Sequence, residues 1–361
     1  MKSFWFVIII VAAVGIGYFV LKNPAHNAGT VTLGVIAGTT GDYAAAGEGY
    51  VNGFELARGE WNKSHQLQFA DITEDDGFNA QKGVAAYAKL KSVDKVDAYA
   101  VLSSFTIDAI ANDLRKEGKP VALGFEQSIP AEDDNIVQVL PAARPIQKAL
   151  GQYLKELGYK RPVVVVSNNT SVYQNFYAGF VDGFGIGVLK EDLASDPVAF
   201  RSVALKVKAD NPDVIVFYAD PPSGALTTRE IIKDFSGHLP QLAFDQSIES
   251  GIADYQQVFG NSLQQLNGTI IALSKNDFTD AFRQAYQAKY KNAAPFGSDM
   301  GYNSFMLLAL TYDRSQTKWV QNMKTVHFTG ADGDVSFDGV GLRVPNIYFG
   351  KLKNGQVVLA N

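Results

Sequence analysis

The first candidate for chemistry is a set of hydrogen-bond donors in the glycine turn at residues 38–41. A β-rich run, 31–36, precedes the turn, and apolar residues at helical spacing follow it as far as Asn62. A strand–turn–helix unit points backbone N–H groups at the space above the strand, where a helix N-terminus favours an anion such as a carboxylate. The turn therefore predicts a small-ligand site, although its glycines are also explained by the turn alone.

No nucleotide motif accompanies this turn. The sequence GTTGDYAAAG lacks the G-x-G-x-x-G spacing of a dinucleotide site, and it lacks the lysine that a phosphate-binding P-loop requires. The sequence therefore favours a ligand other than a nucleotide.

A pair of serines forms the second candidate. Ser103 and Ser104 follow an expected strand at 98–102 and precede an expected helix at 106–117. A serine in this position caps the helix, and the same orientation also presents its hydroxyl to a ligand. Both interpretations stay open at this stage.

Other polar clusters do not form catalytic or metal sites. The segment 332–338 imitates the start of an EF-hand loop, but Phe337 stands where glycine is required and Arg343 where the glutamate ligand belongs, so a β-turn is expected. The acidic runs 74–76 and 132–134 are expected to be solvated loops. The four histidines show no metal-ligand spacing. We therefore expect no enzyme activity, no metal and no cofactor.

The elements that must position these residues alternate between short β-rich runs and amphipathic helices. Strands are expected at 31–36, 67–72, 98–102 and 121–123, with helices at 45–64, 80–91 and 106–117. This rhythm predicts an α/β fold with a doubly wound parallel sheet.

The rhythm restarts after Pro145, which indicates a second α/β lobe. Helices are expected at 145–157, 172–184, 200–209, 224–235, 280–291 and 302–314, and strands at 163–166, 214–218, 242–244 and 268–272. The extended segment 137–145 is expected to cross between lobes. The chain is expected to close with a hairpin that turns at Asn354 and Gly355.

In this order, several segments resemble one known family. They are LGVIAGTTGDYAAAGEGYVNGFELA, DDGFNAQKGVAAYAKL, VDAYAVLSSFTIDAIANDLRKEGKPV, GYNSFMLLAL and FTGADGDVSFDGVG. The chain resembles the leucine/isoleucine/valine-type extracytoplasmic substrate-binding proteins of ABC transporters, which have the type I periplasmic binding-protein fold. The resemblance covers almost all of residues 30–361.

The resemblance implies two lobes, three crossovers and a ligand cleft between the lobes. Carried onto this chain, lobe 1 takes residues 30–140 plus 273–322, and lobe 2 takes 141–272 plus 323–361. Residues 1–29 precede them as an apolar helix and linker. The hinges are expected near 140–143, 271–273 and 329–333.

The resemblance also implies the ligand-binding residues. Ser104, beside Ser103, matches a serine that holds the ligand's carboxylate, and Tyr173 matches an aromatic that closes over the ligand from lobe 2. Phe125 and Gln127 lie where the family often has a small residue and a hydroxyl, so Gln127 is a departure.

Alternative residues match the position expected to meet a ligand ammonium. Either Asp245 or Gln246 matches a family carboxylate, and Asp220 is a substitute if Gln246 is the match. Ala46 stands where aliphatic amino-acid binders carry an aromatic wall, with Tyr43 close by, so branched-chain specificity does not follow.

Composition and charge limit the possible partners. The chain has 361 residues, which is enough for about two domains, and a formal net charge of −5. Lys and Arg are scattered rather than clustered, so we expect no nucleic-acid partner. Cysteine is absent, which excludes disulfides and the thiol of a lipoprotein anchor.

The N-terminal run at residues 4–21, FWFVIIIVAAVGIGYFVL, is an export element. It is just long enough to cross a bilayer, and no small-x-small cleavage site follows it. An uncleaved membrane anchor is favoured over a removed signal peptide, so we expect an extracytoplasmic protein in the cell envelope.

These observations favour a non-enzymatic receptor that delivers an amino acid or similar small polar ligand to ABC permease subunits. The alternative is a sensor component of the same fold that signals through a separate partner. A third possibility, an envelope enzyme, would need an activated nucleophile or an acid–base pair, and neither is visible in the sequence.

Overall fold

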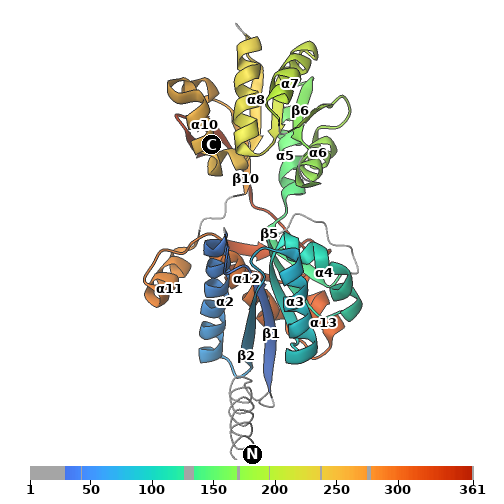
Figure 1. Ribbon diagram of the computed structural model, residues 1–361, viewed down its shortest axis with the longest axis vertical. Helices are drawn as coiled ribbons and strands as arrows, with labels where there is room; N and C mark the ends of the chain where they lie inside the picture. Colours follow the sequence, from blue (N-terminus) through green and yellow to red (C-terminus); the bar gives the residue numbers. More distant parts are fainter. Residues whose placement is uncertain are drawn as a thin grey trace, which may run out of the picture.

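The computed structural model describes residues 29–359 except 42, 126–133, 169–170, 195, 236–237 and 275–277. Two lobes lie one above the other along the long axis, and slender connections join them (Figure 1). The apolar run at residues 4–21 lies outside the described residues, as does Gln127. Within the described part, no helix is both long and apolar enough to cross a membrane.

Lobe 1 is built on a six-stranded sheet in the order β13-β5-β4-β3-β1-β2. Every pairing within it is parallel. Its strands are β1 (Thr30–Ala37), β2 (Gln68–Asp75), β3 (Ala98–Ser103), β4 (Val121–Phe125), β5 (Ile136–Pro141) and β13 (Leu342–Arg343). A separate hairpin joins β11 (His327–Gly330) to β12 (Gly333–Ser336).

Helices cover both faces of this sheet, so its central strands are buried runs of apolar residues. One face packs against α2 (Ala44–Ser64), α12 (Ser298–Thr311) and α13 (Gln316–Met323). The other packs against α3 (Ala80–Lys89), the π-turn Leu90–Asp94 and α4 (Ser104–Glu117). Helix α11 (Asp280–Tyr290) packs beside α2.

Close packing of α2 on α12 depends on glycine. A Cβ at Gly53 would collide with the carbonyl of Ser298, and one at Gly301 would collide with the carbonyl of Tyr50. Larger residues at these two positions would force the helices apart.

Lobe 2 contains a seven-stranded sheet in the order β15-β14-β10-β9-β8-β6-β7, parallel except at β14 and β15. Its strands are β6 (Pro162–Ser167), β7 (Leu189–Leu193), β8 (Val214–Tyr218), β9 (Gln241–Asp245), β10 (Ile270–Ser274), β14 (Ile347–Lys353) and β15 (Gln356–Leu359). The closing hairpin at Asn354 and Gly355 is confirmed.

The faces of this second sheet bury two apolar clusters. Helices α5 (Ala143–Glu156) and α6 (Ser171–Phe184) cover one face. Helices α7 (Pro197–Ala209), α8 (Pro221–Asp234), α9 (Ser247–Ser250) and α10 (Ile252–Phe259), with the 3₁₀ segment Gly260–Leu266, cover the other. The predicted doubly wound α/β class is therefore confirmed.

The crossovers differ from the expected ones in two places. The chain leaves lobe 1 between Pro141 and Ala143, but its return follows Ser274 rather than 271–273. The third crossover lies between Arg343 and Ile347, because β13 pairs with β5 and the β11–β12 segment packs on lobe 1. The boundary expected at 322/323 and the hinge expected at 329–333 are therefore wrong, and residues up to 343 belong to lobe 1.

Candidate ligand-binding site

The strands that end at the crossovers show which edge of each sheet faces the other lobe. Strand β5 ends at Pro141 in the first crossover, and β10 ends at Ser274 in the second. Because parallel strands share one direction, the carboxyl ends of both sheets face the region between the lobes (Figure 1). Loops at carboxyl ends are where open α/β sheets bind ligands.

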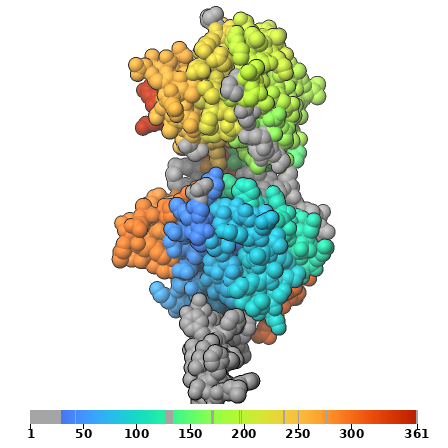
Figure 2. Space-filling view, in the orientation of Figure 1, coloured from blue at the N-terminus to red at the C-terminus, as the bar shows by residue number. Residues whose placement is uncertain are grey.

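A pocket of about 510 Å³ lies at the crossovers. The surface narrows between the lobes at this level (Figure 2). Both lobes and the connecting strands contribute to the lining, which includes Leu140, Leu273, Ser274, Phe296, Asp299, Gln246 and Glu249. Of the predicted site residues, Gln246 lines this pocket directly.

The two predicted serines have different environments. Ser103 is 1% exposed, accepts a hydrogen bond from the backbone N–H of Thr106 at 3.3 Å, and donates its own hydroxyl to Asp76 at 3.1 Å. Ser103 is therefore the cap of α4, as one of the two interpretations expected. Ser104 begins the helix and is half-buried, so it is the more accessible of the pair.

The donors of the 38–41 turn are bonded to a carboxylate of the chain itself. Asp75 accepts from the backbone N–H of Thr39 at 2.7 Å and from the Thr40 hydroxyl at 2.5 Å. Burial raises the pKa of Asp75, but hydrogen bonds from Thr40, Gly77 and Thr39 outweigh this and leave it below its ordinary value. The donors of this turn, which we expected to bind an anionic ligand, therefore bind the carboxylate of Asp75 instead.

The acidic run 74–76 is not the solvated loop that we expected. Asp75 ends β2, and Asp76 is fully buried, where it also accepts a 2.5 Å hydrogen bond from the Thr106 hydroxyl. Asp134 is likewise buried and pairs with Arg115, whereas Glu132 and Asp133 lie outside the described residues. Sequence neighbours gave no sign of these distant partners.

Aromatic side chains occupy the remaining carboxyl-end positions of lobe 1. Tyr43, before α2, is 64% exposed and meets Phe78 edge-on at 5.4 Å between ring centroids. Phe125, at the end of β4, is 40% exposed and meets Phe296 at 5.9 Å. Lobe 1 therefore presents apolar rings on this side.

Three of the predicted lobe 2 residues gather in one place. Asp220 caps α8 by accepting from the backbone N–H of Ser223 at 3.3 Å, and it also accepts from the Ser223 hydroxyl at 2.7 Å. Tyr173, on α6, is half-buried, and its pKa is raised first by burial and then by the charges of Asp245 and Asp220. The structure thus brings Tyr173, Asp220 and Asp245 within electrostatic reach of one another.

Asp245 and Gln246 have different surroundings. Asp245 is 3% exposed at the end of β9, and burial raises its pKa to about 6 against the opposing hydrogen bond from the Ser247 hydroxyl, 2.7 Å away. Gln246 is exposed, and its amide oxygen accepts from the backbone N–H of Ser274 at 3.2 Å. Asp245 therefore lies with Tyr173, whereas Gln246 turns toward the crossover.

A family model for periplasmic binding proteins matches residues 30–356. The chain belongs to the periplasmic binding protein family.

Solved structures show the same fold, the type I arrangement that the sequence predicted. The leucine-binding protein LivK of Thermotoga maritima is 20% identical, with a TM-score of 0.69 over 92% of this chain and 98% of that one. The protein LivJ of Streptococcus pneumoniae, in complex with isoleucine, is 19% identical, with a TM-score of 0.67 over 92% of this chain and 100% of that one.

Another similar structure holds a different kind of ligand. A solute-binding protein of an ABC transporter from R. palustris, in complex with benzoate, is 19% identical, with a TM-score of 0.64 over 92% of this chain and 96% of that one. A comparison with curated protein sequences finds no match.

Two polar side chains near the candidate site of this periplasmic binding protein were not predicted from the sequence. Tyr218 is the last residue of β8 and Asp245 the last of β9, each one residue beyond the paired Phe217 and Phe244, so their side chains share one face of the sheet. Asp299, on α12 beside the crossovers, is 9% exposed, and burial together with the charge of Asp332 raises its pKa to about 6. Only the pairing of distant strands and helices identifies them.

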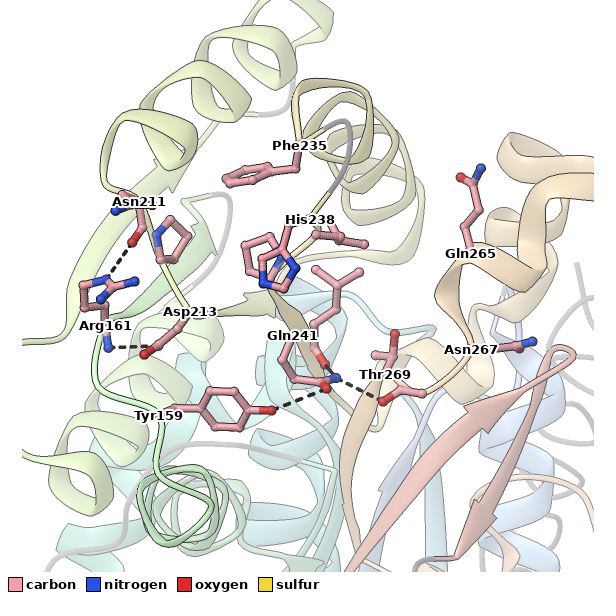
Figure 3. A pocket seen from close by; sticks show the side chains of 15 residues that line it. Tyr159, Arg161, Asn211, Asp213, Phe235, His238, Gln241, Gln265, Asn267 and Thr269 are labelled. Atoms are coloured by element: carbon pink, nitrogen blue, oxygen red, sulfur yellow. Dashed lines mark hydrogen bonds between the residues drawn. The ribbon is translucent and has the colours of Figure 1, made fainter.

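A larger pocket, of about 680 Å³, lies at the opposite edge of the lobe 2 sheet (Figure 3). Its polar groups bond within the chain: Gln241 donates to the carbonyls of Leu242 and Gly268, and Asp213 accepts from the backbone of Lys160 and Arg161. This pocket thus lies where strands of lobe 2 begin, away from the crossovers. The described residues contain no group of three potential metal ligands.

Proposed function

We propose that this periplasmic binding protein is a non-enzymatic extracytoplasmic receptor. It captures an amino acid or a similar small polar ligand between its lobes and delivers it to ABC permease subunits. The observation that carries the proposal is the placement of the predicted residues. Ser104 and Phe125 lie at the carboxyl edge of one sheet, Tyr173 and Asp245 lie at that of the other, and the two edges face each other.

The mechanism is closure of the two lobes on the ligand. A ligand bound first to one lobe gains contacts with the other only in the closed form, so binding shifts the population toward that form. Ser104 offers its hydroxyl to a polar atom of the ligand. Phe125 and Tyr43 provide contact area from lobe 1, Tyr173 covers the ligand from lobe 2, and Asp245 interacts with a positively charged group.

Thermal shift and small-angle scattering test the capture step. A panel of amino acids, amides, amines and small carboxylates should contain at least one compound that stabilises residues 29–361, by about 2.7 kcal/mol at 100 times its dissociation constant. The same compound should reduce the radius of gyration, because closure brings the lobes together. A protein that binds a compound tightly without any compaction would contradict the closure mechanism.

We further propose that residues 4–21 tether the protein to the cytoplasmic membrane, with the two lobes outside. The length of the apolar run and the lack of a cleavage site support this proposal. Fractionation and N-terminal sequencing of native material test it. A mature chain that starts near Ala28 or Gly29 would exclude the anchor.

A further inference from the structure

Several donors that would attract an anionic ligand are already bonded to carboxylates of the chain. In lobe 1, the 38–41 turn donates to Asp75, and the hydroxyls of Ser103 and Thr106 at the start of α4 donate to Asp76. In lobe 2, the first turn of α8 donates to Asp220. Helix N-termini and turns of this kind favour negative charge, and here an aspartate supplies it at each one.

These internal carboxylates also make the site edge negative. Asp75 and Asp76 lie at the carboxyl edge of lobe 1, and Asp220 and Asp245 lie at that of lobe 2. Lys82 offsets part of this charge, because its ammonium lies over Gly77, 3.2 Å from the position of a Cβ there. A carboxylate ligand would still meet like charges on both sides, which is costly at a partly buried site.

The buried carboxylate of Asp245, by contrast, would be stabilised by a cationic ligand group. No described Lys, Arg or His forms an ion pair with this buried carboxylate, whose hydrogen-bond donors are the Ser247 hydroxyl and nearby backbone N–H groups. Removing a carboxylate from water without a cation is unfavourable. A bound ammonium would offset that cost.

A second feature beside Asp245 also indicates a missing ligand group. Tyr218 is fully buried, and its hydroxyl has no hydrogen-bond partner among the described residues, although it lies within electrostatic reach of Asp245. Tyr173 and Tyr218 both meet the ring of Phe176 edge-on, at 5.7 Å between ring centroids, and both lie within electrostatic reach of Asp245. A carboxylate within reach of such an aromatic cluster is suited to an ammonium, which interacts with both a negative charge and a ring face.

We propose that the ligand is an organic cation without a free carboxylate. Its ammonium interacts with Asp245 and with the ring of Tyr173, and its apolar part lies against Phe125 and Phe296 of lobe 1. This inference rests on the proposed solute-binding function and assigns a ligand class to the same site.

The test compares compounds that share a skeleton and differ only in charge. Each set consists of an amino acid, the amine formed by removing its carboxylate, and the acid formed by removing its amino group. Suitable sets are leucine, isoamylamine and isocaproate, and phenylalanine, phenethylamine and hydrocinnamate. Calorimetry at millimolar ligand gives the dissociation constants.

We expect an amine to bind at least about tenfold more tightly than its amino acid, and the simple acids not to bind. Tighter binding of an amino acid or acid than of its amine would overturn the inference and leave the solute-binding function standing. If no compound of any charge binds to the folded protein, both the inference and the proposed function fail on this panel.

A pair of substitutions then identifies the carboxylate. Asp245→Asn should weaken binding of the amine by about 10- to 150-fold, because a charge-assisted hydrogen bond is lost. Asp234→Asn is the matched control: it removes the same charge at the end of α8, where Asp234 pairs with Arg201, and should leave affinity unchanged. Equal affinities for both variants, each folded by circular dichroism, would overturn the assignment to Asp245.

Discussion

Both lobes bury aspartate side chains, but the partners of these side chains differ between the lobes. In lobe 1, Asp332 forms two hydrogen bonds with Arg343, at 2.8 and 3.0 Å, and Asp76 accepts from two hydroxyls. In lobe 2, Asp245 is as deeply buried and accepts from the hydroxyl and the backbone of Ser247, but no described cation forms an ion pair with it. Asp332 and Asp76 of lobe 1 are therefore satisfied within the lobe, whereas the buried charge of Asp245 in lobe 2 lacks a cation among the described residues, which a ligand could supply.

The largest expected effect comes from breaking the internal pair of lobe 1. Arg343→Met leaves Asp332 buried without its cation and should lower the free energy of unfolding by about 3 to 5 kcal/mol. Urea unfolding followed by circular dichroism measures this loss. The control in lobe 2 is Arg144→Met, which removes the exposed pair with Asp182 and should cost about 1 kcal/mol or less. Equal losses would remove the contrast between the lobes.

The pH dependence of stability compares one buried acid from each lobe. Burial raises the pKa of both Asp245 and Asp299 to about 6, above the value of about 3.9 in an unfolded chain. A raised carboxyl pKa contributes stability that is present below about pH 4 and is lost as the pH rises through about 6. Each group should therefore cost roughly 1 to 3 kcal/mol over this interval.

Substitution separates these two contributions from those of other acids. Asp245→Asn and Asp299→Asn should each reduce the loss of unfolding free energy between pH 4 and pH 6, measured by urea unfolding at several pH values. Ser247 bonds to Asp245, and Tyr173, Tyr218 and Tyr255 lie within electrostatic reach of it. Asp332 and Arg343 lie within electrostatic reach of Asp299. An unchanged slope in either variant would contradict the raised pKa of that residue.

The same substitution at two aspartates should have opposite consequences at neutral pH. The hydroxyls of Ser103 and Thr106 both donate to Oδ2 of Asp76, and the backbone N–H of Phe78 donates to Oδ1. Asp76→Asn keeps a single acceptor oxygen, which cannot serve both sides, so it should cost about 1 to 3 kcal/mol. Asp245→Asn removes a buried charge and should leave stability equal or higher. Denaturation midpoints at pH 7 give both values, and a larger loss for Asp245→Asn would reverse the comparison.

The smallest expected effect is on ligand release from lobe 2. Tyr173→Ala removes contact area that is complete only in the closed form, so the off-rate should rise by about tenfold while association changes less. Stopped-flow measurements with a bound amine give both rates. Tyr43→Ala provides the comparison in lobe 1, where the exposed ring should contribute less. A slower association with an unchanged off-rate would contradict this role for Tyr173.

Much of the fold was predictable because its central strands are buried on both faces and read as apolar runs. Strands β1, β3, β6 and β8 match their predicted positions to within one residue at each end. Strand β7, LKEDL, was missed because it is a polar edge strand that only its pairing with β6 defines. The third crossover was misplaced because β13 joins the sheet through a short pairing with β5 that no local pattern shows.

The candidate site was predictable where local structure decides it. Ser103 follows a strand and precedes a helix, and this arrangement correctly indicated a cap. The partner of that serine was not predictable, because Asp76 lies 27 residues away in an acidic run typical of a solvated loop. Its burial depends on how α4 packs against β2 and α3, which is a property of the tertiary structure.

The contacts of Arg343 also determine where the molecule can bend. Its guanidinium donates to the carbonyls of Val139 and Asp334 as well as to Asp332, so it ties the end of β5 to the end of β13. Arg343 thus clamps both strands to lobe 1 just before the chain passes from each of them to lobe 2. In the proposed closure, two of the three crossovers then pivot on the few residues beyond this clamp, near Ala142 and at 344–346, so one side chain limits where both can bend.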